Sequence, residues 1–177
     1  MASILMVAGE GLPFIKTGGL ADVIGSLPKA LTERGHEVKV VMPLYKKISD
    51  KYYNELHFDC EYSVSINYHE VPVRVFSKVV DNVCFFFIQH QGYFERDSLY
   101  GYQDDGERFG YFQKAVIEML NQLNYWPNII HCHDWHTGMI PCMVKETHDA
   151  DPRYRAIRFV YTIHNMAYQG NFGPDAR

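Results

Sequence analysis

The stretch SILMVAGEGLPFIKTGGLADVIGSLPKALTERGHEVKVVMP, residues 3–43, places a helical segment between two apolar runs. The first run, Ser3 to Gly9, is continuous and predicts a buried strand. Residues 21–34 have a helical composition, and Gly35 after them suits a left-handed cap. Residues 36–43 predict the second strand. A strand, a helix and a strand in this order predict two parallel strands joined by a right-handed crossover.

The rest of the chain shows two further patterns. Residues 56–89 have a period of two, with β-rich runs over 60–66, 71–80 and 83–88, and they predict an antiparallel insertion at about 56–90. The later predicted elements are a helix over 108–123, a strand over 129–132, a helix over 139–145 and a strand over 157–162. The sum is an α/β fold, a Rossmann-like doubly wound parallel sheet with an antiparallel β insertion.

Two features within the predicted helices bear on where those helices begin and end. Pro28 lies inside the first helical segment, so we expect it either to kink that helix or to start a new one. Asp104 and Glu107 stand at capping-box spacing ahead of the helix over 108–123. We therefore expect their side chains to cap that helix.

Length and charge restrict the class of protein. The chain has 177 residues, of which 47% are hydrophobic and 21% charged, a composition typical of one globular domain. Its 17 basic and 21 acidic residues give a formal charge of −4, with no basic run that would bind nucleic acid or an anionic membrane. The apolar N-terminus is too short for a membrane span and lacks a basic leader. We expect no nucleic-acid partner and no membrane partner.

The cysteine pattern bears on the compartment. Cys60, Cys84, Cys132 and Cys142 are widely spaced, and no two of them form a Cys-x-x-Cys pair. Such spacing does not indicate a disulfide framework. We therefore expect a reducing, cytoplasmic setting.

Polar residues follow three of the predicted strands at their carboxyl ends. They are the pairs Gly9-Glu10, His133-Asp134 and His164-Asn165. In open parallel sheets, ligands bind in the crevice outside the carboxyl ends of the strands. The sequence therefore predicts that three separate loops converge on one site.

The loop after the first strand carries Lys16-Thr17-Gly18-Gly19 at a predicted helix start. It matches neither the P-loop nor the dinucleotide fingerprint, because the required glycines are missing. Backbone amides that no side chain obstructs, at the positive end of a helix, nevertheless favour an anion. The residues alone leave a phosphate site and a plain glycine turn both open.

Three motifs stand in order along the chain: KTGGLADV at 16–23, HDWH at 133–136 and TIHNMAYQG at 162–170. Together they resemble the N-terminal domain of bacterial glycogen synthases and plant starch synthases, and the resemblance extends from Ser3 to about Phe172. It implies that residues 1–177 form the N-terminal half of a B-type glycosyltransferase fold. It also implies that the C-terminal nucleotide-sugar domain of the family is absent from this chain.

The resemblance further implies a retaining glucosyltransferase. Such enzymes move glucose from ADP-glucose, or UDP-glucose, to the non-reducing end of an α-1,4-glucan, and the resemblance implies neither a cofactor nor a metal. The expected partners are the nucleotide sugar, the glucan and the missing C-terminal domain. Because that domain is missing, we expect the chain alone to be inactive, and we expect the choice of nucleotide to be made mostly in the missing half.

The same resemblance assigns the donor side of the site. Lys16 would neutralise the donor diphosphate as charge develops on it, a form of electrostatic stabilisation that is typically a large catalytic term. Gly18 and Gly19 would let the backbone approach the donor and its phosphates. Asp22 matches the acidic position of the motif and would act either there or as a structural helix cap.

On the sugar side, His164 matches a histidine expected to hydrogen-bond the 6-hydroxyl of the transferred glucose. Its backbone carbonyl would face the reacting carbon, and Asn165 would support it at the donor site. Asp134 and His133 match the second motif on the sugar side of the cleft. The resemblance thus implies a catalytic set of Lys16, Asp134 and His164.

Two acceptor-side assignments are less directly matched. Glu10 keeps a polar group in the first loop, although glycines flank it where many family members have serine and a larger residue. Tyr100 is the candidate to stack on the acceptor sugar, in a segment that varies within the family. Tyr93, Phe94, Tyr100 and Tyr102 suit packing against the antiparallel insertion equally well, and we favour packing for most of them.

The residues also allow two other functions. His131 and His133 lie on one side of a predicted strand and would form a zinc site with His136 or Asp134, as in a metal-dependent hydrolase, although the resemblance argues against it. The competing interpretation of His131 is a histidine satisfied within the core. The 13 tyrosines and 11 phenylalanines would suit a non-catalytic glucan-binding module.

Overall fold

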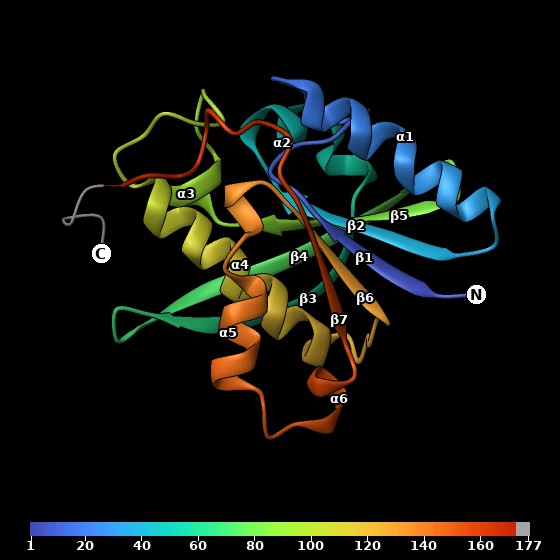
Figure 1. Ribbon diagram of the computed structural model, residues 1–177. Coiled ribbons are helices and arrows are strands. Elements are labelled where there is room, and N and C mark those ends of the chain that lie inside the picture. Colours follow the sequence, from blue (N-terminus) through green and yellow to red (C-terminus); the bar gives the residue numbers. More distant parts are fainter. Residues whose placement is uncertain (173–177) are drawn as a thin grey trace.

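The computed structural model describes residues 1–172, which form a seven-stranded sheet in the order β3-β4-β5-β2-β1-β6-β7 (Figure 1). The strands are β1 Ser3–Val7, β2 Glu37–Pro43, β3 His57–Ile66, β4 His69–Val80, β5 Val83–Gln89, β6 Ile129–His133 and β7 Arg158–Thr162. The pairs β1–β2, β2–β5, β1–β6 and β6–β7 are parallel, whereas β3–β4 and β4–β5 are antiparallel. The predicted α/β sheet with antiparallel strands is confirmed.

Helices cover both faces of the sheet, and the handedness of the connections explains why. The connection β1–α1–β2 runs in one direction across the sheet, and the connection β5–α4–β6 returns in the other. Because both crossovers between parallel strands are right-handed, their helices must lie on opposite faces. Figure 1 shows α1 on one side of the sheet and α4 with α5 on the other.

The helices are α1 Gly19–Glu33, α2 Lys46–Tyr52, α3 Gln91–Phe94, α4 Asp105–Gln122, α5 Ile140–Thr147 and α6 Pro152–Arg155, with the 3₁₀ turns η1 Tyr53–Glu55 and η2 Trp135–Thr137. None of the helices within residues 1–172 has the length and apolar character that crossing a membrane requires.

The position where the chain reverses direction across the sheet lies between β1 and β6. From β1 the chain proceeds to β2 on one side, and it later reaches β6 on the other. At such a switch point the loops after the two strands part and leave a crevice at the carboxyl ends. The fold therefore places the loop after β1 beside the loop after β6.

The antiparallel region is continuous with the main sheet. The β3–β4 hairpin forms one edge of the sheet, while β5 pairs antiparallel with β4 and parallel with β2. Residues 56–90 thus contribute one strand to the parallel core and extend the sheet by two more.

The helix α1 differs from the prediction in where it begins and in its course past Pro28. It begins at Gly19 rather than at residue 21, and it runs without a break through Pro28, so the predicted start of a new helix there is wrong. Pro28 lies on the buried face of the helix together with Leu20 and Ile24. Burial of one continuous face against the sheet outweighs the backbone hydrogen bond that proline removes. Gly35 follows the helix with φ 84°, as its predicted left-handed cap requires.

The predicted capping box at the start of α4 is wrong. Asp104 occupies the N-cap position, but its carboxylate accepts two hydrogen bonds of 2.6 Å from Arg96 instead of capping the helix. The Glu107 carboxylate accepts from the Tyr93 hydroxyl. Charge-assisted bidentate pairing with a guanidinium is stronger than a bond from a backbone amide. Asp104 therefore pairs with Arg96 rather than with the first amides of the helix.

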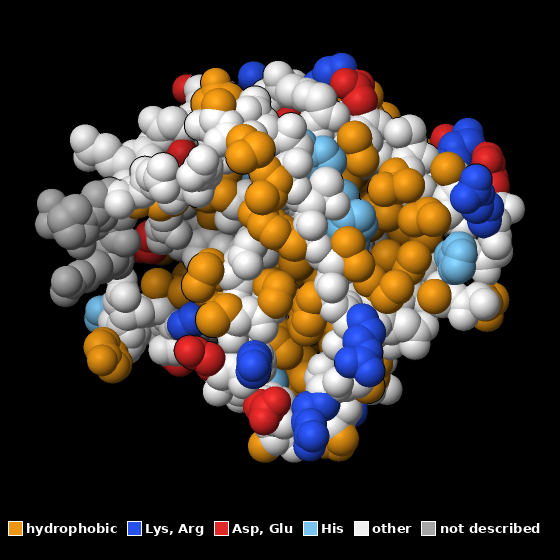
Figure 2. Space-filling model, viewed as in Figure 1, with side chains coloured by type: hydrophobic (Ala, Val, Ile, Leu, Met, Phe, Trp, Pro, Cys, Tyr) orange, Lys and Arg blue, Asp and Glu red, His pale blue; other side chains and the backbone are white. Residues whose placement is uncertain are grey.

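The strand β7 leaves an apolar surface uncovered within the described residues. It pairs with β6 on one side only. Val160 is 44% exposed, Tyr161 46% and Ile163 56%. Figure 2 shows hydrophobic side chains gathered over the centre of this face, where β7 lies in Figure 1. An exposed apolar edge strand is a template for pairing with another chain.

We therefore expect the isolated chain to self-associate through β7. Val160→Lys should shift it toward monomer, because a lysine on an edge strand blocks strand pairing. Sedimentation velocity over a concentration series measures this, with Val79→Lys on β4 as the matched control, since Val79 is 65% exposed elsewhere on the sheet. A wild-type chain that stays monomeric at high concentration would contradict the prediction.

Candidate functional site

A pocket of about 680 Å³ lies at the carboxyl ends of β1 and β6, at the switch point of the sheet. Four segments converge on it: the loop after β1, the turn after β6, the segment after β7, and the segment that leads from α3 into α4. Its lining residues are Glu10, Thr17, Gly18, Gly19, Leu20, Tyr100, Asp105, Asp134, Trp135, His136, His164, Asn165, Ala167, Tyr168, Gln169, Gly170, Asn171 and Phe172. The predicted convergence of three loops is therefore present in the structure.

The loop after β1 is held from within by Glu10. This side chain is buried, and its carboxylate accepts hydrogen bonds from the Thr17 backbone amide and, at 2.8 Å, from the Thr17 hydroxyl. A carboxylate is an acceptor with up to four lone-pair sites, so one group can fix both donors. The contact fixes the backbone just ahead of Gly18 and Gly19, both of which line the pocket.

Gly18 and Gly19 open the pocket at the start of α1. A Cβ atom built on Gly19 would meet no atom within 4 Å, and one on Gly18 would meet only Glu10 Oε1, at 3.5 Å. The protein itself therefore leaves room beside this backbone. Gly18 is the N-cap of a 15-residue helix without a side-chain cap, so the first amides of α1 and its positive end are free to meet an anion.

Lys16 and Asp22 lie beside this loop but not in the pocket lining. The Lys16 amine donates to both carboxylate oxygens of Asp22, at 2.6 and 2.7 Å. Both side chains are about half exposed, at 46% and 53%. Asp22 lies in the first turn of α1 and makes this ion pair, whereas Gly18 is the N-cap residue, so Asp22 does not cap the helix. An exposed pair of this kind contributes about 1 kcal/mol or less, and Lys16 can exchange partners cheaply.

Asp134 connects the turn after β6 to the segment after β7. Its backbone has φ 58° and ψ −178°, a region that non-glycine residues rarely occupy and that costs on the order of 1–3 kcal/mol. The Asp134 Oδ1 atom accepts from the His164 backbone amide at 2.7 Å, and the Asp134 amide donates to the Thr162 carbonyl at 3.0 Å. These bonds fix the strained residue and bring the second and third loops together.

Three histidines form a row beneath this turn. His131 Nε2 lies 2.8 Å from the Thr162 hydroxyl, and the rings of His131 and His133 have centroids 4.0 Å apart. His133 is fully buried, and its Nδ1 lies 2.9 Å from His164 Nε2. The structure thus places His133 behind His164 and outside the pocket lining, while His164 itself lines the pocket. Within residues 1–172, no group of three His, Cys, Asp or Glu side chains is arranged to hold a metal ion.

The segment after β7 covers the far side of the pocket. Asn165 lines it, and its side-chain oxygen accepts from the Ala167 amide at 2.9 Å, which fixes a turn. Gly170 has φ 65°, and a Cβ atom there would lie 2.7 Å from the Trp135 ring. Only glycine allows both this backbone conformation and this close contact.

Tyr100 also lines the pocket, but its ring packs against α4 and η2 rather than against the antiparallel strands. The ring centroids lie 4.6 Å from His136 and 5.9 Å from Phe109. The buried Tyr100 Oη and His136 Nδ1 atoms have no hydrogen-bond partner among the described residues. Both side chains line the pocket, but these two atoms are themselves buried, and Tyr100 Oη lies against Gly9.

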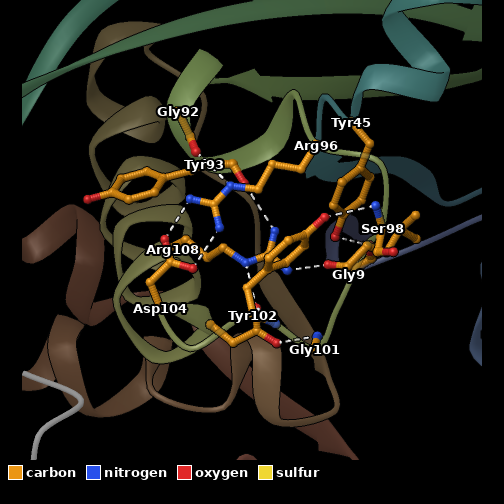
Figure 3. Close-up of polar contacts among 12 residues, drawn as sticks. Gly9, Tyr45, Gly92, Tyr93, Arg96, Ser98, Gly101, Tyr102, Asp104 and Arg108 are labelled. Atoms are coloured by element: carbon orange, nitrogen blue, oxygen red, sulfur yellow. Dashed lines mark hydrogen bonds and ion pairs between the residues drawn. The ribbon is translucent and has the colours of Figure 1, made fainter.

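The segment that carries Tyr100 is held by Arg108, as Figure 3 shows. The Arg108 side chain is fully buried and donates to Asp105 Oδ1 at 2.8 Å, to the Tyr93 carbonyl at 3.0 Å and to the Leu99 carbonyl. The Asp105 carboxylate in turn accepts from the backbone amide of Gly101 at 2.8 Å. One buried ion pair therefore fixes the loop on both sides of Tyr100.

The sequence alone indicated no role for Asp105, Arg108 or Trp135, and it indicated His136 only as a zinc ligand. Asp105 and His136 line the pocket, Arg108 holds the loop, and Trp135 packs beneath Gly170. Asp104, Asp105, Glu107 and Arg108 lie close together in the sequence and could have indicated an ion pair, whereas only Asp104 and Glu107 were considered, as helix caps. The burial of Arg108, which requires a carboxylate partner such as Asp105, is visible only in the structure.

The fold and the pocket define a Rossmann-like ligand-binding domain, with its site at the switch point of the sheet. A family model described as the starch synthase catalytic domain matches residues 3–177, and the chain belongs to this family of glycosyltransferases.

Relatives and a solved structure agree with this assignment. The chain is 46% identical over 172 residues to the glycogen synthase of Streptococcus agalactiae serotype III (strain NEM316), covering 97% of this chain and 36% of that protein. It is 46% identical over 169 residues to the glycogen synthase of Clostridium kluyveri, covering 96% and 36%. The chain thus spans about 36% of the length of these curated relatives.

Among solved structures, the chain is similar to the catalytic domain of starch synthase IV from Arabidopsis thaliana bound to ADP and acarbose. The TM-score is 0.84 at 33% identity, and the match covers 96% of this chain and 35% of that one. The mixed α/β sheet is accordingly that of a domain of a B-type glycosyltransferase fold.

Acid should destabilise the folded chain through two buried histidines. Burial lowers the pKa of His133 and of His136 from 6.5 to about 3. Between these values the unfolded state binds more protons, so the free energy of unfolding falls as the pH falls. At about pH 5, each histidine should lower the free energy of unfolding by about 2 kcal/mol relative to its value at neutral pH.

Urea denaturation at neutral pH and at about pH 5 measures this effect. His136→Phe should remove its share of the pH dependence, whereas His57→Gln on the surface of β3 should leave it unchanged. The same pH dependence in wild type and in His136→Phe would contradict the assignment of His136.

Breaking the buried ion pair should cost far more than breaking an exposed one. Arg108→Leu leaves the Asp105 carboxylate buried without its guanidinium, and the expected loss is about 3–5 kcal/mol in the free energy of unfolding. The control is Arg153→Ala in an exposed pair with Asp151, for which about 1 kcal/mol or less is expected. Equal losses in the two variants, measured by urea denaturation, would refute the structural role of Arg108.

Proposed function

We propose that this chain is the N-terminal half of a retaining glucosyltransferase that moves glucose from ADP-glucose to the non-reducing end of an α-1,4-glucan. The observation that carries the proposal is the pocket at the switch point. The N-terminus of α1, which has no side-chain cap, lines it together with Asp134 and His164, which are joined by a hydrogen bond. The names of the relatives support the reaction class, since they are glycogen synthases and a starch synthase whose solved structure holds ADP and acarbose.

The donor diphosphate would lie at the start of α1. The unobstructed amides around Gly18 and Gly19 suit phosphate oxygens, and the helix end favours negative charge. Lys16 would leave Asp22 and neutralise the leaving diphosphate, because both partners are half exposed and the pair is weak. In the absence of donor, Asp22 would hold the Lys16 amine in their ion pair.

The transferred glucose and the acceptor would occupy the floor of the pocket. His164 and Asn165 would hydrogen-bond the glucose, with His164 at its 6-hydroxyl, and Asp134 would keep both in place through the His164 amide. Tyr100, whose side chain lines the pocket, would stack on the acceptor sugar. Glu10 would shape this side through its bonds to Thr17 rather than touch the reacting atoms.

Retention of configuration would not use a carboxylate nucleophile from this half. The Glu10, Asp22 and Asp134 carboxylates are each engaged, by Thr17, Lys16 and the His164 amide respectively. In a same-face mechanism, the bond between the anomeric carbon and the phosphate oxygen breaks while the acceptor oxygen bonds to that carbon. The proton of the acceptor hydroxyl passes to the leaving phosphate.

The isolated chain would be inactive, because a complementary half is expected to hold the nucleotide and close the cleft against water. The relatives are long enough to supply such a half, since this chain spans only about 36% of them. We place the protein in the cytoplasm, where its four free cysteines would remain reduced.

Amide NMR titration of this chain with ADP-glucose, and separately with maltotetraose, tests the proposal. ADP-glucose should shift the amides of Gly18, Gly19, His164 and Asn165, because these residues surround the proposed donor site. Lys16→Ala should weaken that binding several-fold by removing one phosphate charge. Lys29→Ala is the matched control, since its exposed amine pairs with Asp81 away from the pocket.

Shifts confined to exposed aromatic residues outside the pocket, such as Tyr68, and insensitive to Lys16→Ala, would instead favour a non-catalytic glucan-binding module. No shift with either ligand at millimolar concentration would contradict a preformed half-site.

A further inference from the structure

The side chain of His133 faces His164 and not the pocket. In the register of the parallel pair, His133 of β6 lies beside Thr162 of β7, and His164 follows two residues beyond. Successive side chains alternate in direction, so His164 emerges on the same side as Thr162 and meets the His133 ring. The two rings are nearly parallel, with an interplanar angle of 14° and centroids 5.2 Å apart. The sequence resemblance placed His133 against the sugar, and the structure places it one layer behind.

We propose that His133 is a positioning residue that fixes the orientation and the tautomer of His164 through the Nδ1···Nε2 hydrogen bond. The proposal rests on the proposed function, because it concerns the histidine assigned there to the transferred glucose. It adds a role for a side chain that touches neither substrate.

The tautomer follows from the surroundings of the two nitrogens of His133. Burial, with His131 and His164 adding to it, lowers the pKa of His133 to about 3, so the ring is neutral near pH 7 and carries one N–H. Its Nε2 is buried and has no partner among the described residues. An orphaned buried N–H is rarer than an under-satisfied acceptor, so the proton belongs on Nδ1. That N–H donates to His164 Nε2 over 2.9 Å.

The consequence for His164 is a defined hydrogen-bonding face. With Nε2 accepting from His133, a neutral His164 must carry its proton on Nδ1. The backbone amide of His164 is held separately, by Asp134 Oδ1 at 2.7 Å. Two consecutive residues thus fix His164: His133 holds its ring, and Asp134 holds its backbone amide. His164 then offers a donor suited to a hydroxyl oxygen, the group that a sugar presents.

Long-range ¹H–¹⁵N correlation spectra of the histidine rings in this chain test the proposal without substrate. In wild type at neutral pH, His164 should show a protonated Nδ1 and a bare Nε2, and His133 a protonated Nδ1. His133→Phe keeps the ring but not the bond, so His164 should become a mixture of both tautomers. His133→Asn, whose amide N–H can donate to Nε2, should restore the single form.

The matched control is His131→Phe, because His131 packs against His133 but bonds to Thr162 rather than to His164. It should leave the His164 tautomer unchanged. If His133→Phe does not fold, the proposal is tested on the wild type alone, by measuring the scalar coupling across the hydrogen bond between His133 Nδ1 and His164 Nε2. Absence of that coupling, or a single His164 tautomer that survives in His133→Phe, would overturn the proposal.

Because these spectra need neither donor nor acceptor, their outcome is separate from that of the ligand titrations. A fixed tautomer in a chain that binds no ADP-glucose would uphold the contact and refute the function. Ligand binding with a mixed His164 tautomer in wild type would do the reverse.

Discussion

The opposite directions in which the chain leaves β1 and reaches β6 determine most of what this domain can do. Right-handed crossovers put α1 on one face of the sheet and α4 with α5 on the other, and the loops between them cannot close over the carboxyl ends. The crevice left there receives the positive end of α1 from one side and the Asp134 turn from the other. The topology therefore places a binding site at this crevice, with the end of a helix that favours an anionic group on one side and a polar turn on the other.

Buried polar groups then convert the crevice into a shaped pocket. Glu10 holds the loop ahead of Gly18, Arg108 with Asp105 holds the segment that carries Tyr100, and His133 holds the ring of His164. Each of these groups acts one layer behind the pocket or at its margin. A buried charge or imidazole is expensive unless paired, so each contact fixes its loop firmly. Tyr100 and His136 add their rings to the pocket wall, packed against each other with centroids 4.6 Å apart.

The sequence predicted the sheet well, because apolar periodicity and the handedness rule act locally and over a few elements. It also placed Glu10, Asp134 and His164 at strand ends that meet. It failed where side chains compete: Asp104 pairs with Arg96 instead of capping α4, and burial of one face carries α1 through Pro28. Alternation along β6 correctly placed His131 and His133 on one side, but only the register with β7 reveals that His133 meets His164. Such pairings depend on contacts between residues distant in sequence.

The central claim is that the start of α1 in this half is a preformed site for the donor diphosphate. A crystal structure of the chain grown with ADP-glucose tests it most directly. The account predicts phosphate oxygens within hydrogen-bonding distance of the backbone amides at Gly18 and Gly19, with the Lys16 amine moved from Asp22 to the phosphate. A diphosphate bound elsewhere on the chain, with the Lys16–Asp22 pair intact and the α1 amides empty, would contradict it.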